Sequence, residues 1–313
     1  MILVMGATGQ VGSKVVSHLL SHNQKVRCVA RSFPKKDLFP GAEFALGDAN
    51  NVSFMADAMR GCSAALVMIP ENLQSTETRY YQNKIGEVIA EAIEEAGIKK
   101  IVNLSSIGAD LESGTGHILG LHDQEQRLNE ITHADIVHLR PAYFMENFLS
   151  GIPSIISMNR YFSTVPEEVP CHMIATRDIA SRAAFLLMNP QFESQNVESL
   201  LGERELSFGE AIHIIGDTIQ RPDLEYVEVA DKDMMKFLMG SGISEDSAEG
   251  LLEMETAIGN GTFMATVSRD KINTTATSFE EFARTTFLEA YRRVKTTDKS
   301  QRNSQSSPRD QDL

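Results

Sequence analysis

Cysteine is scarce in this chain of 313 residues, which contains three: Cys28, Cys62 and Cys171. Because they are odd in number and far apart, they form neither a disulfide framework nor a metal-binding spacing. We therefore expect a reducing compartment and no metal ion. The first expected strand begins at residue 2, which leaves no room before it for a signal peptide, so a cytoplasmic protein is expected.

Positive charge and long apolar runs are scarce as well. The 29 lysines and arginines face 43 aspartates and glutamates, which gives a formal net charge of −14. Nucleic acids and anionic membrane surfaces attract proteins through lysine and arginine, so neither is an expected partner. No apolar run reaches the length needed to span a bilayer. Apolar residues still make up 42% of the chain, enough for a sizeable core, and the expected partner is a small-molecule substrate.

The start of the chain, ILVMGATGQVGSKVVSHLL, carries the strongest signal. The apolar run from Ile2 to Met5 predicts a strand, and the apolar residues after the glycines recur at helical spacing. The turn between them consists of Gly6, Ala7, Thr8, Gly9, Gln10, Val11 and Gly12. A helix that starts here points its unpaired backbone N–H groups at the turn, where a pyrophosphate can bind. The three glycines therefore predict a dinucleotide site.

Strands and helices alternate through the first half of the chain. The expected strands are 2–5, 25–32, 42–46, 64–69, 100–105 and 135–139, and the expected helices are 11–20, 51–60, 74–97 and 117–131. This alternation predicts a parallel sheet with helices on both faces, and strands buried on both sides read as continuous apolar runs. The expected fold class is α/β, a Rossmann-type doubly wound parallel sheet.

The pattern loosens after residue 141. Residues 141–175 suggest a loop-rich segment; helices are expected at 177–189, 207–219, 231–240, 244–257 and 278–294, and strands at 197–201 and 224–229. We expect a smaller α/β C-terminal cap over the sheet edge where ligands of open α/β folds bind. The expected division is 1–150 for the NAD(P)-binding domain, 151–294 for the substrate-side cap that completes the same fold, and 295–313 for a disordered polar tail.

In this fold, the residue at the end of the second strand contacts the adenosine ribose of the cofactor. An acidic residue there favours NAD, whereas this chain has Arg31. A cation suits a 2′-phosphate, so NADPH is expected in preference to NADH. Arg31 could instead simply end a strand at the surface, and the nearby Lys35 and Lys36 suit solvated loop positions better than ligand positions.

Further cofactor contacts are expected where the next strands end. The candidates at the ends of the third, fourth and fifth strands are Asp48, Ala49, Met68, Ile69, Pro70 and Ser105. Asp48 could meet the adenine, although a turn or cap role suits it equally well. The cofactor must pass the end of the fourth strand. The hydroxyl of Ser105 can reach the nicotinamide or the substrate, unless Ser105 is only a turn residue.

Six segments together resemble one family: GATGQVG, VARS, GDA, IVNLSSIGA, LRPAYFMENF and TSFEEFA. They are similar to the NmrA-like branch of the atypical short-chain dehydrogenases, over roughly residues 1–290. That branch includes NAD(P)H-dependent quinone reductases, triphenylmethane-dye reductase and NADP-sensing regulators. The resemblance implies the fold and a nicotinamide cofactor. It leaves the substrate and catalysis itself open, because a shared fold does not carry a shared reaction.

The resemblance also implies two catalytic positions. The stretch HDQE at 122–125 resembles a His-and-acid element of that branch, which implies that His122 lies near the cofactor. The segment that contains Tyr143 would lie against the nicotinamide side. His122 could donate a proton or hold the ribose, and Tyr143 could donate a hydrogen bond or stack on the substrate. A surface histidine and a core aromatic are the alternatives, and His117 is a further candidate.

The usual catalytic pair of short-chain dehydrogenases is missing. That pair is Tyr-x-x-x-Lys and follows the fifth strand. Tyr80 and Lys84 have the spacing but precede that strand, and Tyr291 and Lys295, which also have it, lie near the end of the chain, so no correctly placed pair follows Ser105. Carbonyl reduction by the usual tyrosine acid is therefore not expected.

Two functions fit these observations. The first is an NADPH-dependent oxidoreductase that transfers hydride to a small conjugated or aromatic acceptor, quinone-like or enone-like. Its support beyond the cofactor signals is the apolar and aromatic content of residues 143–162, which suits either a pocket for a flat molecule or the core of the cap. The alternative is a non-catalytic NADP(H)-sensing regulator that binds a protein partner, which the missing Tyr-x-x-x-Lys pair and the polar tail favour.

Overall fold

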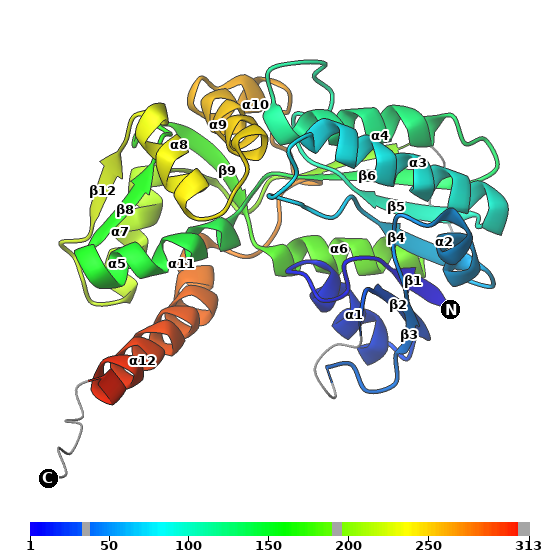
Figure 1. Cartoon of the computed structure of the whole chain (residues 1–313), viewed down its shortest axis with the longest axis horizontal. Helices are drawn as coiled ribbons and strands as arrows, with labels where there is room; N and C mark the ends of the chain where they lie inside the picture. The colour runs from blue at the N-terminus through cyan, green and yellow to red at the C-terminus, as the bar shows by residue number, and fades with distance from the viewer. Residues whose placement is uncertain (33–37, 190–195, 306–313) are drawn as a thin grey trace, which may run out of the picture.

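The computed structural model describes residues 1–32, 38–189 and 196–305, with only the backbone described from residue 298 onwards. Its largest sheet has seven strands in the order β10-β6-β5-β4-β1-β2-β3, and every neighbouring pair is parallel (Figure 1). The strands are β1 (Ile2–Val4), β2 (Val26–Ala30), β3 (Glu43–Leu46), β4 (Ala64–Val67), β5 (Lys100–Leu104), β6 (Asp135–Pro141) and β10 (Asn196–Leu200). The expected Rossmann-type doubly wound sheet is confirmed.

Helices cover both faces of this sheet (Figure 1). One face carries α2 (Val52–Met59), α3 (Thr78–Ala96) and α4 (Leu119–Asn129), and the other carries α1 (Gly12–Ser21) and α6 (Thr176–Met188). Consecutive strand residues alternate between two apolar cores. Leu3 and Ala65 face the core under α2, α3 and α4, and Val4 and Leu66 face the core under α1 and α6. Because side chains alternate along a strand and both faces are covered, the central strands β1 and β4 are apolar at every position.

The chain leaves the sheet after β6 and later returns to it. Helix α6 packs beside α1, and β10 adds a parallel edge strand to β6, with Val197 opposite His138. Helix α6 and strand β10 therefore complete the layered sheet although they follow residue 150, where the sequence places the end of the first domain. Local pattern predicts the strand itself, but which sheet a strand joins depends on a partner distant in sequence.

The cap contains more regular structure than its sequence indicates. Residues 141–175, expected to be loop-rich, contain β7 (Tyr143–Phe144), η2 (Met145–Gly151), α5 (Ile152–Met158), β8 (Arg160–Ser163) and β9 (Pro170–Ile174). Strand β9 pairs with β7 and with β11 (Glu205–Ser207), and β8 pairs with β12 (Glu225–Glu228). Strands this short are stabilised by remote partners, so the local sequence does not reveal them.

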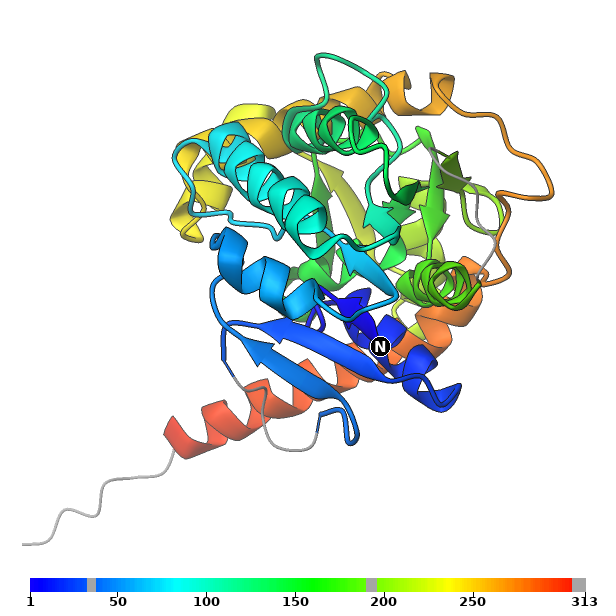
Figure 2. The same ribbon diagram turned by 90° about the vertical axis from the view of Figure 1, so that its right-hand side faces the viewer.

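The remaining elements are η1 (Gly116–Ile118), α7 (Phe208–Thr218), α8 (Asp231–Gly240), α9 (Glu245–Gly259), α10 (Thr262–Ala265), α11 (Phe279–Phe282), η3 (Ala283–Phe287) and α12 (Leu288–Gln305). Helix α12 projects away from the rest of the fold in both views (Figures 1 and 2). Residues 295–305, expected to belong to the tail, continue this helix from the buried Tyr291. Residues 306–313 lie outside the described residues. None of the described helices is long and apolar enough to cross a membrane.

A capping box lies at the N-terminus of α7. The Ser207 hydroxyl accepts the Glu210 N–H at 3.1 Å, and the Glu210 carboxylate accepts the Ser207 N–H at 2.7 Å. Ser207→Ala removes one of these bonds and is expected to lower the free energy of unfolding by about 1 kcal/mol in urea denaturation. Nucleotide binding, which depends on the other end of the fold, should not change. An unchanged unfolding midpoint would contradict this role for the cap.

Candidate active site

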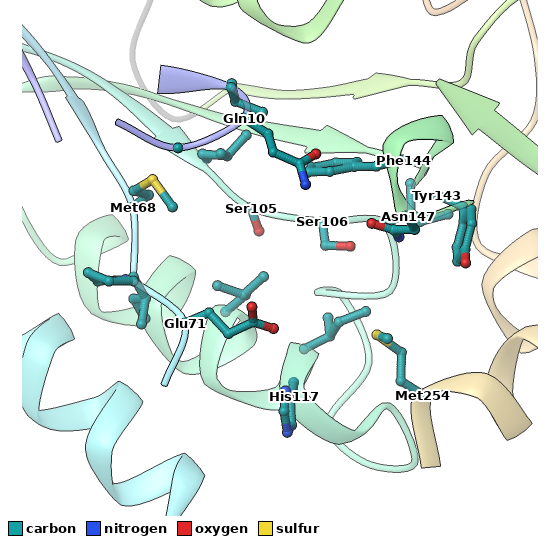
Figure 3. A pocket seen from close by; sticks show the side chains of 18 of the residues that line it. Gln10, Met68, Glu71, Ser105, Ser106, His117, Tyr143, Phe144, Asn147 and Met254 are labelled. Atoms are coloured by element: carbon teal, nitrogen blue, oxygen red, sulfur yellow. The ribbon is translucent and has the colours of Figure 1, made fainter. Parts of the chain in front are cut away.

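A cavity of about 570 Å³ opens at the carboxyl-terminal edge of the large sheet. Its walls come from the glycine turn after β1, the segments after β4, β5 and β6, η1 with the start of α4, and α9 and α10 of the cap (Figure 3). Ligands of open α/β folds bind at this edge. Of the expected site residues, those that line the cavity are Gly6, Thr8, Gly9, Gln10, Val11, Gly12, Met68, Ile69, Pro70, Ser105 and Tyr143. Those outside its lining are Ala7, Arg31, Asp48, Ala49 and His122.

The glycine turn is packed too tightly for side chains. Gly6 has a φ of +62°, and a Cβ there would lie 2.4 Å from the Met68 sulfur. A Cβ on Gly12 would lie 2.2 Å from the Gly6 carbonyl oxygen, while the Gly9 N–H donates to that same oxygen at 2.8 Å. The Ser13 and Lys14 N–H groups donate to the Gly9 and Val11 carbonyls, at 3.1 and 3.0 Å, whereas the N–H groups of Gln10, Val11 and Gly12 have no backbone acceptor among the described residues. The turn thus offers backbone donors and an uncrowded approach, which fits a pyrophosphate.

A buried polar network fixes the turn to the cap. The Lys14 ammonium donates to the Gln10 carbonyl and to the Thr176 hydroxyl, both at 2.9 Å. Glu146, which is 4% exposed, accepts the Thr176 N–H at 3.0 Å. These contacts join α1, η2 and α6 at one point. Sequence reasoning missed Lys14, Glu146 and Thr176, because nothing in a local pattern marks a carboxylate as buried.

Arg31 and Asp48 lie beyond the cavity, where the second and third strands end. Both are exposed. The pKa of Asp48 is lowered first by hydrogen bonds from the Asn50 backbone and side chain, at 3.0 and 2.8 Å, and further by the charge of Arg31. Asp48 therefore has the turn role that its sequence context allows, and Ala49 beside it is half-buried. Lys35 and Lys36 lie outside the described residues.

The hydroxyl of Ser105 is already engaged. It donates to Glu125 at 2.5 Å, and Arg140 binds the same carboxylate through two nitrogens at 2.9 and 2.5 Å. Burial lowers the pKa of Arg140, but its hydrogen bonds to Glu125 and the charge of that carboxylate outweigh burial and leave the pKa raised. Ser105 thus lines the cavity as a fixed group, anchored from behind by a buried ion pair.

His122, expected beside the cofactor, is not among the residues that line the cavity. Its Nδ1 lies 2.9 Å from the Ala109 carbonyl oxygen. Ile118 and Leu121 line the cavity from the same helical segment, and His122 is rotated by about 100° from Leu121. The HDQE stretch is a structural clamp in this chain: Glu125 holds Ser105, and the carboxylate of Asp123 accepts from Arg79 and Asn83.

Tyr143 contributes its ring rather than a free hydroxyl. The ring packs edge-on against Phe148 and Phe208, with centroids 5.8 and 5.3 Å apart. Its hydroxyl interacts with that of Tyr161, and each affects the pKa of the other. Burial is the main reason why the pKa of Tyr143 lies well above its ordinary value of 10, so the phenol stays neutral.

The cavity wall is mostly apolar in area and has few charged side chains. Among the described lining residues, Glu71 is the only carboxylate, His117 is the only histidine, and there is no lysine or arginine. Figure 3 shows Glu71 and His117 on one side of the cavity and Ser105 and Ser106 on the facing side. The described residues contain no cluster of His, Cys, Asp and Glu side chains able to hold a metal ion.

The sheet, its glycine turn at a helix N-terminus and the apolar cavity beside it define a dinucleotide-binding protein of the Rossmann type. The chain belongs to the NmrA-like family, whose model matches residues 1–283. The NAD(P)H azoreductase of Xenophilus azovorans is 26% identical over 256 residues, which are 81% of this chain and 86% of the azoreductase.

Solved structures show the same fold. An NADPH-dependent quinone oxidoreductase from Escherichia coli, complexed with NADPH, has a TM-score of 0.74 at 19% identity, and the match covers 92% of this chain and all 100% of that one. The triphenylmethane reductase of Citrobacter sp., complexed with NADP(H), also has a TM-score of 0.74, at 21% identity, over 90% of this chain and 99% of that one.

Proposed function

We propose that this protein is an NADPH-dependent oxidoreductase that transfers hydride to a small conjugated or aromatic acceptor. The observation that supports the proposal is that one cavity extends from the glycine turn to an apolar part under the cap. This part, the chamber, is lined by Phe144, Met254 and Phe263. A dinucleotide bound at the turn and an apolar molecule in the chamber would share that space. The oxidoreductase names of its relatives, the azoreductase among them, support the same reaction class.

The residues of this chain would bind and orient the reactants. The amides at the start of α1 hold the pyrophosphate, and the segment from Met68 to Pro70 borders the cofactor's path. When bound, NADPH supplies the hydride, while the protein fixes the geometry. Phe144, Met254 and Phe263 give the chamber apolar walls, suited to a flat aromatic acceptor. The apolar walls also exclude water from the place where the two reactants meet.

Arg31 is proposed to bind the 2′-phosphate that distinguishes NADPH from NADH. A charge-assisted hydrogen bond is worth roughly 1.5–3 kcal/mol, so Arg31→Ala should weaken NADPH binding about 10- to 100-fold and leave NADH binding nearly unchanged. Calorimetric titration of both nucleotides measures this. Arg60→Ala is the matched control, because Arg60 is an exposed arginine paired with Asp57 at the end of α2. Equal losses for NADPH and NADH would rule out contact with the 2′-phosphate.

The second candidate is a non-catalytic NADP(H)-sensing regulator that binds a protein partner. It is favoured by the engagement of two cavity hydroxyls, since Ser105 is bound to Glu125 and Tyr143 interacts with Tyr161. A sensor needs the nucleotide site but no proton donor.

Steady-state oxidation of NADPH separates the two functions. The reductase predicts that loss of NADPH absorbance depends on an added quinone or conjugated enone and saturates with its concentration. Tight NADPH binding without turnover on any quinone, enone or aromatic dye would leave the sensor as the better account.

A further inference from the structure

The reduction of a neutral acceptor needs a proton as well as a hydride, and the cavity offers few groups to supply it. Ser105 already donates to Glu125, and the Tyr143 hydroxyl interacts with that of Tyr161. Burial raises the pKa of the Cys171 thiol to about 12, which makes it a poor acid near neutrality. His122 is hydrogen-bonded to Ala109 outside the cavity lining. Burial also raises the pKa of Tyr81, another lining residue. His117 is the only imidazole among the described lining residues, and imidazole is the side chain whose ordinary pKa lies near neutrality.

The ring of His117 is held against α9 by a close approach of two backbones. Gly116 has a φ of +55°, and a Cβ on it would lie 1.9 Å from the Gly250 carbonyl oxygen. A Cβ on Gly250 would in turn lie 2.4 Å from His117 Cδ2 and 2.8 Å from Nε2. The Cδ2–Nε2 edge of the imidazole therefore faces α9, and ring geometry leaves Nδ1 on the opposite edge. The backbone is fixed as well, because Gln82 donates to the His117 carbonyl at 2.9 Å.

The surroundings of His117 are acidic. Glu71, from the segment after β4, acts on the ring most strongly, followed by the Ser247 backbone and then by the charge of Asp246, both from α9. All three favour the protonated ring, but burial outweighs them and keeps the pKa of His117 below its ordinary value of 6.5. Nε2 is buried and has no well-formed hydrogen bond among the described residues. The ring is thus tightly packed, has one buried nitrogen without a well-formed hydrogen bond in the described part of the chain, and shares the cavity with the Glu71 carboxylate.

We propose that His117 is the proton donor of the reductase and that Glu71 is the positioning residue that supports its charged form. The inference rests on the proposed function. The acceptor gains a hydride, with two electrons, from NADPH, which is oxidised, and becomes an anion. The Nδ1–H bond of protonated His117 then breaks, the proton bonds to the anion, and water returns a proton to the ring.

A pair of acceptors tests this role. A neutral naphthoquinone needs hydride and a proton, whereas a cationic triarylmethyl dye is neutralised by hydride alone. His117→Gln is expected to lower kcat with the quinone about 100-fold, a typical contribution of general acid catalysis, and to change kcat with the dye less than threefold. His213→Gln is the control, because His213 is an exposed histidine on α7 with its side chain 71% exposed.

The pH profile gives an independent readout. Since protonated His117 is the active form, kcat/KM of the wild type with the quinone should fall as pH rises through a value below about 6.5. His117→Gln should flatten this profile, and Glu71→Gln should move it to lower pH by removing a charge that favours the protonated ring. The profile with the cationic dye should be flat in all variants.

Several outcomes would overturn the role. Equal loss with both acceptors, a rise in KM alone or an unchanged pH profile would each make His117 a packing or binding residue. Thermal unfolding and NADPH titration identify a variant that fails to fold, and His117→Asn then provides the second substitution. If the wild type binds NADPH but reduces neither acceptor, the proposed function fails first, and the inference fails with it.

Discussion

Gly12→Ala is expected to abolish tight binding of NADPH. The new Cβ would lie 2.2 Å from the Gly6 carbonyl oxygen and 3.1 Å from the Ala7 nitrogen, and both are backbone atoms that no side-chain rotation can move. The turn must therefore shift, and the amides of α1 move with it. Loss of one or two charge-assisted hydrogen bonds to phosphate, about 3 kcal/mol, would weaken binding roughly 100-fold. Overpacking should also cost about 1–3 kcal/mol of stability.

Gly240→Ala is the matched control for this prediction. Gly240 ends α8, and a Cβ there would have no atom within 4 Å. Alanine at this position should leave both NADPH affinity and stability nearly unchanged. Calorimetric titration and urea denaturation of the two variants provide the comparison. If Gly12→Ala binds NADPH as tightly as the wild type, the turn does not hold the pyrophosphate.

Glu125→Ala is expected to cause the largest loss of stability. Glu125 is 2% exposed, and it accepts from both Arg140 and Ser105. Removing one partner of a buried pair typically costs 3–5 kcal/mol, because the other charge stays buried without compensation. Asp110, 3.4 Å from Arg140, can compensate in part, so we expect about 3 kcal/mol. The Ser105 hydroxyl would also lose its acceptor.

The control for Glu125 is a surface ion pair of similar geometry. Arg160 and Glu225 are 2.8 Å apart with side chains 51% and 59% exposed. Glu225→Ala should lower the free energy of unfolding by less than about 1 kcal/mol, because solvent screens an exposed pair. Urea denaturation of the two alanine variants makes the comparison. Equal losses would mean that burial does not distinguish the Glu125 pair.

The fold was predictable where local pattern decides it. The turn from Gly6 to Gly12 lies between an apolar strand and a helix with a clear apolar period, and most residues of the five strands that follow are apolar. Where remote pairing decides, the sequence is silent. The place of β10 beside β6 and the short strands β8 and β9 depend on partners far along the chain.

In the candidate site, too, the features set by local sequence were predictable and those set by remote packing were not. Backbone contacts at the glycine turn follow from residue type and spacing, and the lining residues there are those expected. Side-chain roles follow from rotation about a helix and from long-range packing, which a motif does not specify. His122 shares its HDQE stretch with Glu125, yet it binds a loop carbonyl while Glu125 reaches Ser105. Glu71 stands in an irregular segment without any motif and lines the cavity all the same.

The transfer of deuterium is the most direct test of the reductase account. NADPH deuterated at the transferable position of its nicotinamide is incubated with the wild-type protein and a conjugated enone, and the product is analysed by mass spectrometry. The account predicts one deuterium at the β-carbon of the saturated product, because hydride passes directly from NADPH to that carbon. Reduced product without deuterium, or bound NADPH that stays unoxidised with every acceptor, would contradict it.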